Sequence, residues 1–132
     1  MADNIPGDLK YTKDHEWLRV QGNHAVVGVT DHAQKQLGDV VYVELPKVGD
    51  KVEATEPVGS IESVKAVSEV FSPVSGKVTK VNDTLSDEPE QVNSDPYGDG
   101  WLVEIELSDS KQVAGLLDAA AYGNYIKEEA SE

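Results

Sequence analysis

The sequence has no cysteine among its 132 residues, few basic residues and no long apolar run. Without cysteine, the chain forms neither a disulfide framework nor a zinc-thiolate site, so any sulfur chemistry must come from an attached group. The 11 lysine and arginine residues are outnumbered by 25 aspartate and glutamate residues, which gives a net charge of -14. This charge repels the phosphates of nucleic acids and of anionic membranes. We therefore expect acidic surfaces that meet other proteins, and neither nucleic-acid nor membrane binding.

The apolar residues are dispersed in short segments. None approaches the length of about 20 residues that spans a bilayer, and residues 1–7 lack the basic region and apolar stretch of a secretion signal. We expect a cytoplasmic protein of the bacterial type, or a protein of an organelle matrix if a transit peptide has been removed. The length fits a single domain, residues 1–132, with a core that needs no covalent staples.

The first half of the sequence alternates β-rich runs with turn residues. Residues 17–20 and 25–29, separated by the turn at 22–23, predict a hairpin. A further strand precedes Pro46, and its alternation predicts one face in the core. The residues expected on that face are Val41, Val43 and Leu45.

Two segments predict helices. Thr30 or Asp31 can cap a short helix over residues 31–37, and Gly38 suits a left-handed position after it. Near the C-terminus, apolar residues at helical spacing predict a second helix that packs on the sheets. Its apolar stripe consists of Val113, Leu116, Leu117 and Ala120.

The central segment, residues 58–81, has an ambiguous pattern. Its apolar residues recur at intervals of three or four, which by itself favours a helix. Gly59, Pro73 and Gly76 oppose a helix, since proline in a helix interior costs about 3 kcal/mol. We therefore predict short strands with turns and place residues 64–66 at a hairpin tip.

The last part of the chain combines a polar stretch with an apolar one. Residues 82–99 are rich in acidic residues and contain two prolines, which predicts a surface loop. Alternation over residues 101–107 predicts a closing strand.

Lys65 lies in the central segment, residues 58–81, among small, hydroxylic and β-branched residues. Glu62 and Glu69 flank it, and nearby carboxylates favour the charged ammonium over the nucleophilic amine. Lys65 therefore fits an attachment point better than a catalytic base; the alternative is an ordinary solvated lysine. No phosphate-binding loop, nucleophile elbow or zinc-protease motif occurs, so we expect no self-contained enzyme.

A cluster of acidic and histidine residues, 14–16, precedes the first predicted strand. Such residues beside a strand are commonly solvated. With His32 they could suggest a metal site, but the histidines share no ligand spacing. We expect no metal.

The residues around Lys65 match a known attachment motif. Segment 62–66, followed by 72–76, resembles the H protein of the glycine cleavage system. Valine precedes the lysine and alanine follows it, whereas lipoyl domains of acyltransferases have aspartate before the lysine and biotin domains have methionine on both sides. The likeness covers nearly the whole chain and includes segments 11–17, 28–34, 37–41, 43–46 and 93–101.

This resemblance implies a mainly β, barrel-sandwich hybrid fold and a lipoyl carrier without catalytic activity of its own. Lipoic acid would be joined to Lys65 by an amide, within a motif formed by Glu62, Ser63, Val64 and Ala66. The carrier would receive the aminomethyl group of glycine from the pyridoxal-dependent glycine decarboxylase (P protein) and deliver it to the tetrahydrofolate-dependent aminomethyltransferase (T protein). Dihydrolipoyl dehydrogenase (L protein) would reoxidise the arm. A lipoate ligase or lipoyl/octanoyl transferase would attach the group, and we expect a monomer.

The resemblance also implies a cleft that shelters the aminomethyl group from water. The matching positions are Asp14, Glu16, Val29, Leu37, Ala66 and Glu69, and we expect the carboxylates among them to meet the amine. Glu69 and Val67 stand where many members carry aspartate and alanine. These departures leave the attachment motif intact.

Two other functions remain open on the sequence. An H-like protein could serve lipoate supply, as donor or acceptor in lipoyl transfer to other enzymes. Alternatively, the chain could be an unmodified interaction domain, in which Lys65 is a solvated surface residue.

Overall fold

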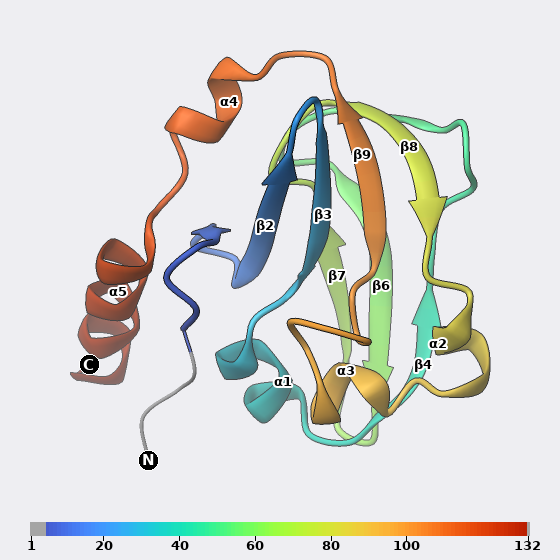
Figure 1. Ribbon diagram of the computed structural model, residues 1–132. Coiled ribbons are helices and arrows are strands. Elements are labelled where there is room, and N and C mark those ends of the chain that lie inside the picture. The colour runs from blue at the N-terminus through green and yellow to red at the C-terminus, as the bar shows by residue number, and fades with distance from the viewer. Residues whose placement is uncertain (1–4, 132) are drawn as a thin grey trace.

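The computed structural model describes residues 5–131, so the ends of the expected 1–132 domain lie outside the described residues. Nine strands in this range form two antiparallel sheets (Figure 1), one with the order β1-β2-β3-β9-β8-β5 and one with the order β4-β6-β7. The strands are β1 (Lys10–Tyr11), β2 (Glu16–Gln21), β3 (His24–Val29), β4 (Val40–Glu44), β5 (Lys51–Val52), β6 (Pro57–Ser63), β7 (Val67–Phe71), β8 (Gly76–Val81) and β9 (Val103–Leu107).

Five helices occur in the described range, and most are short. The first and third lie at the same end of the molecule, and the last lies outside the sheets beside β1 (Figure 1). None of the helices in the described range is both long and apolar enough to cross a membrane. The helices are α1 (Asp31–Leu37), α2 (Thr84–Asp87), α3 (Gln91–Ser94), α4 (Lys111–Ala114) and α5 (Ala119–Ser131).

The main core lies between the two sheets. Alternate residues of the strands point inward, and the buried set includes Val27, Val43, Ile61, Val78 and Ile105. Fully burying one such side chain stabilises the fold by about 1.5–3 kcal/mol. Both sheets therefore contribute to one shared core.

A second apolar cluster lies beneath α5. Leu9, Tyr11, Trp17, Tyr122 and Ile126 form its buried part. Trp17 lies across its partner on β3, Gly28, where a Cβ atom would come within 2.6 Å of the indole ring. The absence of a side chain at this position therefore allows the tryptophan to pack flat on the sheet.

Three local predictions are confirmed. The N-terminal hairpin forms from β2 and β3. The Thr30 side chain accepts a hydrogen bond from the Ala33 N–H and caps α1, and Gly38 follows with a positive φ of 77°, although its ψ of -157° lies outside the left-handed helical region. The central segment forms strands, with residues 64–66 at the tip between β6 and β7.

The strand β4 forms where expected, but its inward face is partly wrong. Its pairing with β6 shifts in register between Val40 and Tyr42. Val40 is therefore buried, whereas Val41 is 48% exposed. Such an irregularity exchanges the two faces of a strand, and only from Val43 onward does the predicted alternation hold.

Two regions differ from the prediction in their helices: the polar stretch 82–99 and the C-terminal part of the chain. The polar stretch 82–99 includes α2 and α3, which bury Leu85 and Val92. The C-terminal helix is present as α5, but the predicted stripe is divided between α4, a connecting segment and α5, and Ala120 is exposed. The buried residues of α5 are instead Tyr122 and Ile126.

Candidate functional site

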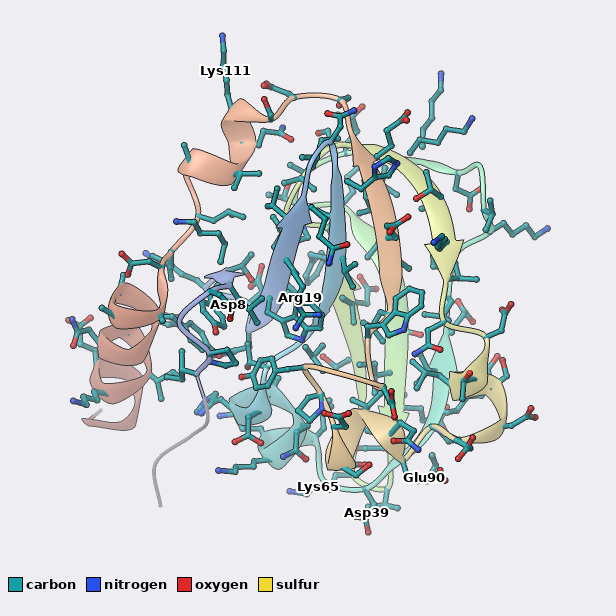
Figure 2. All side chains as sticks on the ribbon, in the orientation of Figure 1. Asp8, Arg19, Asp39, Lys65, Glu90 and Lys111 are labelled. Carbon is teal, nitrogen blue, oxygen red and sulfur yellow. The ribbon has the colours of Figure 1, made fainter. Side chains whose placement is uncertain are left out.

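Lys65 is exposed at the tip of the β6–β7 hairpin, at one end of the molecule (Figure 2). The tip is closed by a 2.8 Å hydrogen bond from the Ser63 N–H to the Ala66 carbonyl. The Ser63 hydroxyl is buried and accepts hydrogen bonds from the N–H groups of Lys65 and Ala66, both at 3.2 Å. The backbone of the lysine is thus held while its side chain faces solvent.

The tip is also attached to the segment that follows α1. The Val64 N–H donates to the Asp39 carbonyl at 3.0 Å, and Lys65 Nζ lies 3.4 Å from the Gln36 carbonyl. A Cβ atom on Gly38 would lie 2.9 Å from Lys65 Cε. The lysine side chain therefore lies across a glycine, which leaves room for it and also adopts the positive φ.

Asn93 of α3 holds this segment in place. Its side-chain oxygen accepts a hydrogen bond from the Val40 N–H at 2.9 Å, and its amide nitrogen donates to the Gly38 carbonyl at 2.8 Å and to Gln34 Oε1 at 3.1 Å. Asn93 is not among the site residues predicted from the sequence. It lies in a polar stretch, and only the tertiary structure brings it beside residues 38–40.

The other residues of the predicted attachment motif lie at the tip and beside it. On the outer face of the three-stranded sheet, Glu62 pairs across β4 and β6 with Tyr42 and across β6 and β7 with Val67. Val64 is 67% exposed and Val67 is 66% exposed. Glu62, Val64 and Ala66 thus face solvent near the lysine, and Ser63 is the buried member of the motif.

A cleft of about 310 Å³ lies beside the hairpin tip and includes Ala66. All six residues predicted for a sheltering cleft line it, namely Ala66 together with Asp14, Glu16, Val29, Leu37 and Glu69. They come from four separate parts of the chain. The cleft is also lined by residues that were not predicted for it: His15, Ala33, Gln36, Ile61, Val67, Ser68 and Val70.

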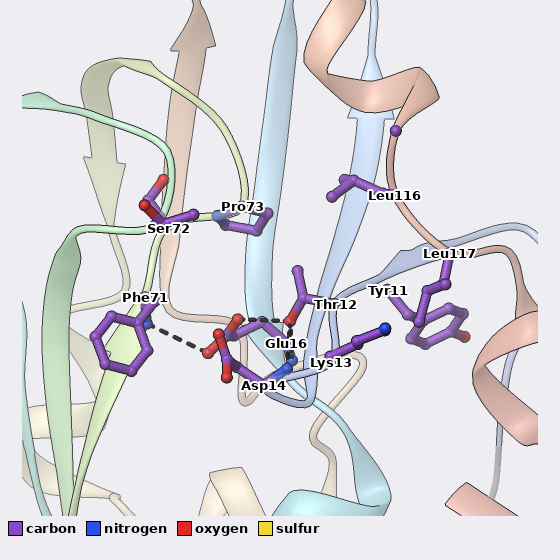
Figure 3. A pocket seen from close by; sticks show the side chains of 12 residues that line it. Tyr11, Thr12, Lys13, Asp14, Glu16, Phe71, Ser72, Pro73, Leu116 and Leu117 are labelled. Carbon is purple, nitrogen blue, oxygen red and sulfur yellow. Dashed lines mark hydrogen bonds between the residues drawn. The ribbon is translucent and has the colours of Figure 1, made fainter. Parts of the chain in front are cut away.

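Glu16 is the most buried charged group of the cleft, with 3% of its surface exposed. Burial raises its pKa from the ordinary value of 4.5 to about 7, and the charge of Asp14 raises it slightly further. Two donors act in the opposite direction: the Thr12 hydroxyl at 2.6 Å from Oε1 and the Phe71 N–H at 3.3 Å from Oε2 (Figure 3). The expectation of solvated acidic residues at 14–16 is therefore wrong for Glu16, because tertiary packing covers it.

A smaller cavity of about 240 Å³ adjoins the other side of Glu16. Residues 115–117, between α4 and α5, cover part of it, and Asp14 lines it as well (Figure 3). Asp14 and Glu16 therefore lie between the cleft and this smaller cavity.

The histidines near the cleft are closer together than their sequence positions suggest. The rings of His15 and His32 have centroids 4.7 Å apart. Within the part of the chain that the structure describes, no group of three or more His, Asp or Glu side chains converges in a metal-binding arrangement. His15 instead contacts α5 through Tyr122, with 2.8 Å between Nδ1 and the phenolic oxygen.

Comparison with known proteins identifies the family. Residues 9–129 match the family described as the glycine cleavage H-protein. The chain belongs to the glycine cleavage H-protein family. It is 71% identical over 122 residues to the glycine cleavage system H protein of Myxococcus xanthus (strain DK1622), covering 92% of this chain and 95% of that protein. The corresponding protein of Anaeromyxobacter sp. (strain K) is 59% identical over 125 residues, which cover 95% of this chain and 98% of the relative.

A solved structure has the same fold. The crystal structure of a glycine cleavage system H protein from Mycobacterium marinum superimposes with a TM-score of 0.84 at 39% identity, covering 96% of this chain and 99% of that one. The predicted mainly β, barrel-sandwich fold is confirmed by this likeness and by the two antiparallel sheets. The identity over nearly full length also supports the predicted carrier role in the glycine cleavage system.

Proposed function

We propose that this chain carries a lipoyl group on Lys65 and transports the aminomethyl group of glycine between the enzymes of the glycine cleavage system. Membership of the H-protein family supports the carrier role, and it implies the P, T and L proteins as partners. A lipoate ligase or a lipoyl/octanoyl transferase would attach the group. The carrier would act as a monomer without catalytic activity of its own.

The observation that carries the proposal is one exposed lysine amine beside a cleft with a buried carboxyl group. Lys65 is held at a hairpin tip by its backbone, so an enzyme can approach the amine without opening the fold. Cysteine is absent from the chain, so the protein cannot form a mixed disulfide with a sulfur-containing arm of its own. These features fit lipoic acid as the attached group.

When bound, the lipoyl group supplies a disulfide that can be reduced as it accepts the aminomethyl group. The chain supplies attachment at Lys65 and shelter in the cleft. The walls of the cleft combine apolar side chains, such as Val29 and Leu37, with the carboxyl groups of Asp14, Glu16 and Glu69. Apolar walls limit the access of water, and carboxylates favour an ammonium group in their vicinity.

Glu16 is suited to hold the amine of the cargo. Its pKa is raised to about 7 mainly because the side chain is buried, which disfavours the ionised form. An arriving ammonium group would stabilise that ionised form, and the two charges would then compensate each other's desolvation. We expect the pKa of Glu16 to fall when the aminomethyl group is present.

The decisive experiment is lipoylation in vitro followed by reconstitution. The chain is incubated with lipoate and a lipoate ligase, and peptide mapping locates the added mass. The lipoylated protein is then combined with glycine, tetrahydrofolate and the other three components. Modification at Lys65 together with glycine breakdown would support the proposal. Protein that stays unmodified, also when isolated from its native host, would contradict it and favour an interaction domain.

A further inference from the structure

The C-terminal helix contacts His15, a residue that lines the cleft, through Tyr122 and Tyr125, and of these two Tyr122 makes the hydrogen bond. Tyr122 of α5 is fully buried. Its phenolic oxygen lies 2.8 Å from His15 Nδ1 and 2.7 Å from the hydroxyl oxygen of Thr30, which caps α1. Its ring stacks on Tyr11, with centroids 4.7 Å apart and planes inclined by 4°. The stacking restrains the position of the phenolic hydroxyl group. Through these contacts, Tyr122 connects α5 to Tyr11, His15 and Thr30.

His15 needs such support because of its backbone conformation. Its φ is 69°, which is unfavourable for a residue that has a Cβ atom. The His15 N–H donates to the Thr12 carbonyl at 3.1 Å, and the His15 carbonyl accepts from the Thr30 N–H at 3.0 Å. The hydrogen bond to Tyr122 restrains the side chain of the same residue. Together these contacts stabilise residue 15 in an unfavourable backbone conformation.

The direction of the chain at His15 determines how two carboxyl groups meet the cleft. Asp14 and Glu16 are its immediate neighbours, and all three residues line the cleft. The carboxyl group of Glu16 is further restrained by Thr12 and by the Phe71 N–H. A rotation of the backbone at residue 15 would move Asp14 relative to Glu16 and would open the buried carboxyl group to water.

We propose that Tyr122 is a positioning residue for the cleft: through its hydrogen bond to His15, it keeps Asp14 and Glu16 directed at the site where the aminomethyl group is sheltered. This proposal rests on the proposed function, because it assigns a task within the same cleft. The helix α5 lies outside the sheets beside β1 (Figure 1), and through Tyr122 it would contribute to the shelter although none of its residues lines the cleft.

The first test uses the protein without an attached group and so does not depend on lipoylation. The titration of the Glu16 carboxyl carbon is followed by NMR in the wild type, in Tyr122→Phe and in the control Tyr11→Phe. Tyr11 belongs to the same stack, but its hydroxyl donates to the Pro6 carbonyl, away from His15. We expect the pKa of Glu16 to fall toward its ordinary value of 4.5 in Tyr122→Phe and to stay near 7 in Tyr11→Phe. An unchanged titration in Tyr122→Phe, or an equal shift in both variants, would overturn the proposal.

The second test measures how long the lipoylated protein retains the aminomethyl group. We expect Tyr122→Phe to lose it about 2- to 10-fold faster than the wild type, the range that corresponds to the loss of one hydrogen bond. Lipoyl loading, measured by mass, should be unchanged in both variants. Wild-type retention in Tyr122→Phe would refute the positioning role. A lack of loading in the wild type would instead refute the proposed function, and the NMR result would still decide the role of Tyr122.

A second pair of variants covers the case in which Tyr122→Phe does not fold. His15→Ala removes the same hydrogen bond and leaves the Tyr11–Tyr122 stack in place, so it should lower the pKa of Glu16 in the same direction. Where both single variants fold, the double variant Tyr122→Phe/His15→Ala should lose the aminomethyl group no faster than the more affected single variant. Two side chains that act through one contact are not additive. Additive effects, or a wild-type titration in His15→Ala, would count against the proposal.

Discussion

The hairpin tip around Lys65 and the floor of the cleft at Glu16 belong to one site but are built in opposite ways. The tip is exposed, and its backbone is organised by a hydroxyl group two residues before the lysine. The floor is buried, and Glu16 is held by contacts to residues 12 and 71. Local hydrogen bonds suffice to order an exposed hairpin tip, whereas excluding water requires several segments to converge.

The largest effect is expected at the tip. In Lys65→Arg the side chain keeps its charge but offers a poor acceptor for an acyl group, so lipoylation and glycine breakdown should be lost completely. The fold should be retained, because the side chain is exposed. Intact-mass measurement after incubation with a lipoate ligase checks the first point, and circular dichroism checks the second.

The matched control for this variant is Lys77→Arg, which changes an exposed lysine of β8. It should gain the lipoyl mass like the wild type. If Lys65→Arg were also modified, the attachment point would lie elsewhere, and the contrast between tip and cleft would lose its basis.

The second prediction concerns Glu16 in the cleft and the dependence of the unfolding free energy on pH. The pKa of Glu16 is raised from 4.5 to about 7. The folded protein therefore binds this proton more tightly than the unfolded chain does, and protonation of Glu16 stabilises the fold. That contribution is complete below pH 4.5 and is lost as the pH rises through 7. Glu16→Gln cannot ionise, so between pH 4.5 and 8 the wild type should lose about 3 kcal/mol of unfolding free energy relative to this variant.

Urea unfolding at several pH values measures this difference. Glu62→Gln provides the control, since it removes one exposed carboxylate, and its stability curve should run parallel to that of the wild type. Parallel curves for Glu16→Gln would mean that water reaches Glu16, and the floor would then resemble the tip in its exposure.

The third prediction separates backbone strain from contact with the lysine. Gly38 has a φ of 77° and lies against Lys65, whereas Gly22 has a φ of 63° with open space around it. Alanine at either position should reduce the unfolding free energy by about 1–3 kcal/mol, because both backbones need a positive φ. Only Gly38→Ala should also slow lipoylation, since its methyl group displaces the lysine side chain.

Thermal unfolding and the initial rate of lipoyl transfer measure the two effects separately. Equal rates of lipoylation in Gly38→Ala and Gly22→Ala would show that the position of the lysine side chain is irrelevant to the attaching enzyme.

The smallest effect is expected for Ser63→Ala. This change removes the hydroxyl group that accepts from the N–H groups of Lys65 and Ala66. We expect a loss of about 1 kcal/mol in unfolding free energy and a modest decrease in the rate of lipoylation. Denaturant unfolding and the same transfer assay provide the measurements.

Ser60→Ala is the control for this last variant, because it lies on the same strand, β6, away from the tip. Equal effects of the two alanine variants would contradict a specific role of Ser63 in ordering the tip.

Elements with local signals were predicted correctly. The hairpin of β2 and β3 follows from a turn between two β-rich runs, and α1 follows from its capping threonine and terminal glycine. The inward face of β4 was predicted incorrectly at Val41, because the register shift against β6 depends on a partner strand. The buried anchors Leu85 and Val92 were missed for a similar reason: isolated apolar residues in a polar stretch give no periodic pattern.

The sequence by itself determined that the chain has no cysteine and which short segments form strands, turns and caps, and it predicted Lys65 as an attachment point. These properties depend on residue type and on neighbours along the chain. The tertiary structure decided that Glu16 is buried, that Asn93 holds the segment beside the lysine, and that Tyr122 reaches His15. The physical reason is that desolvation and long-range hydrogen bonds arise only when segments remote in sequence pack together.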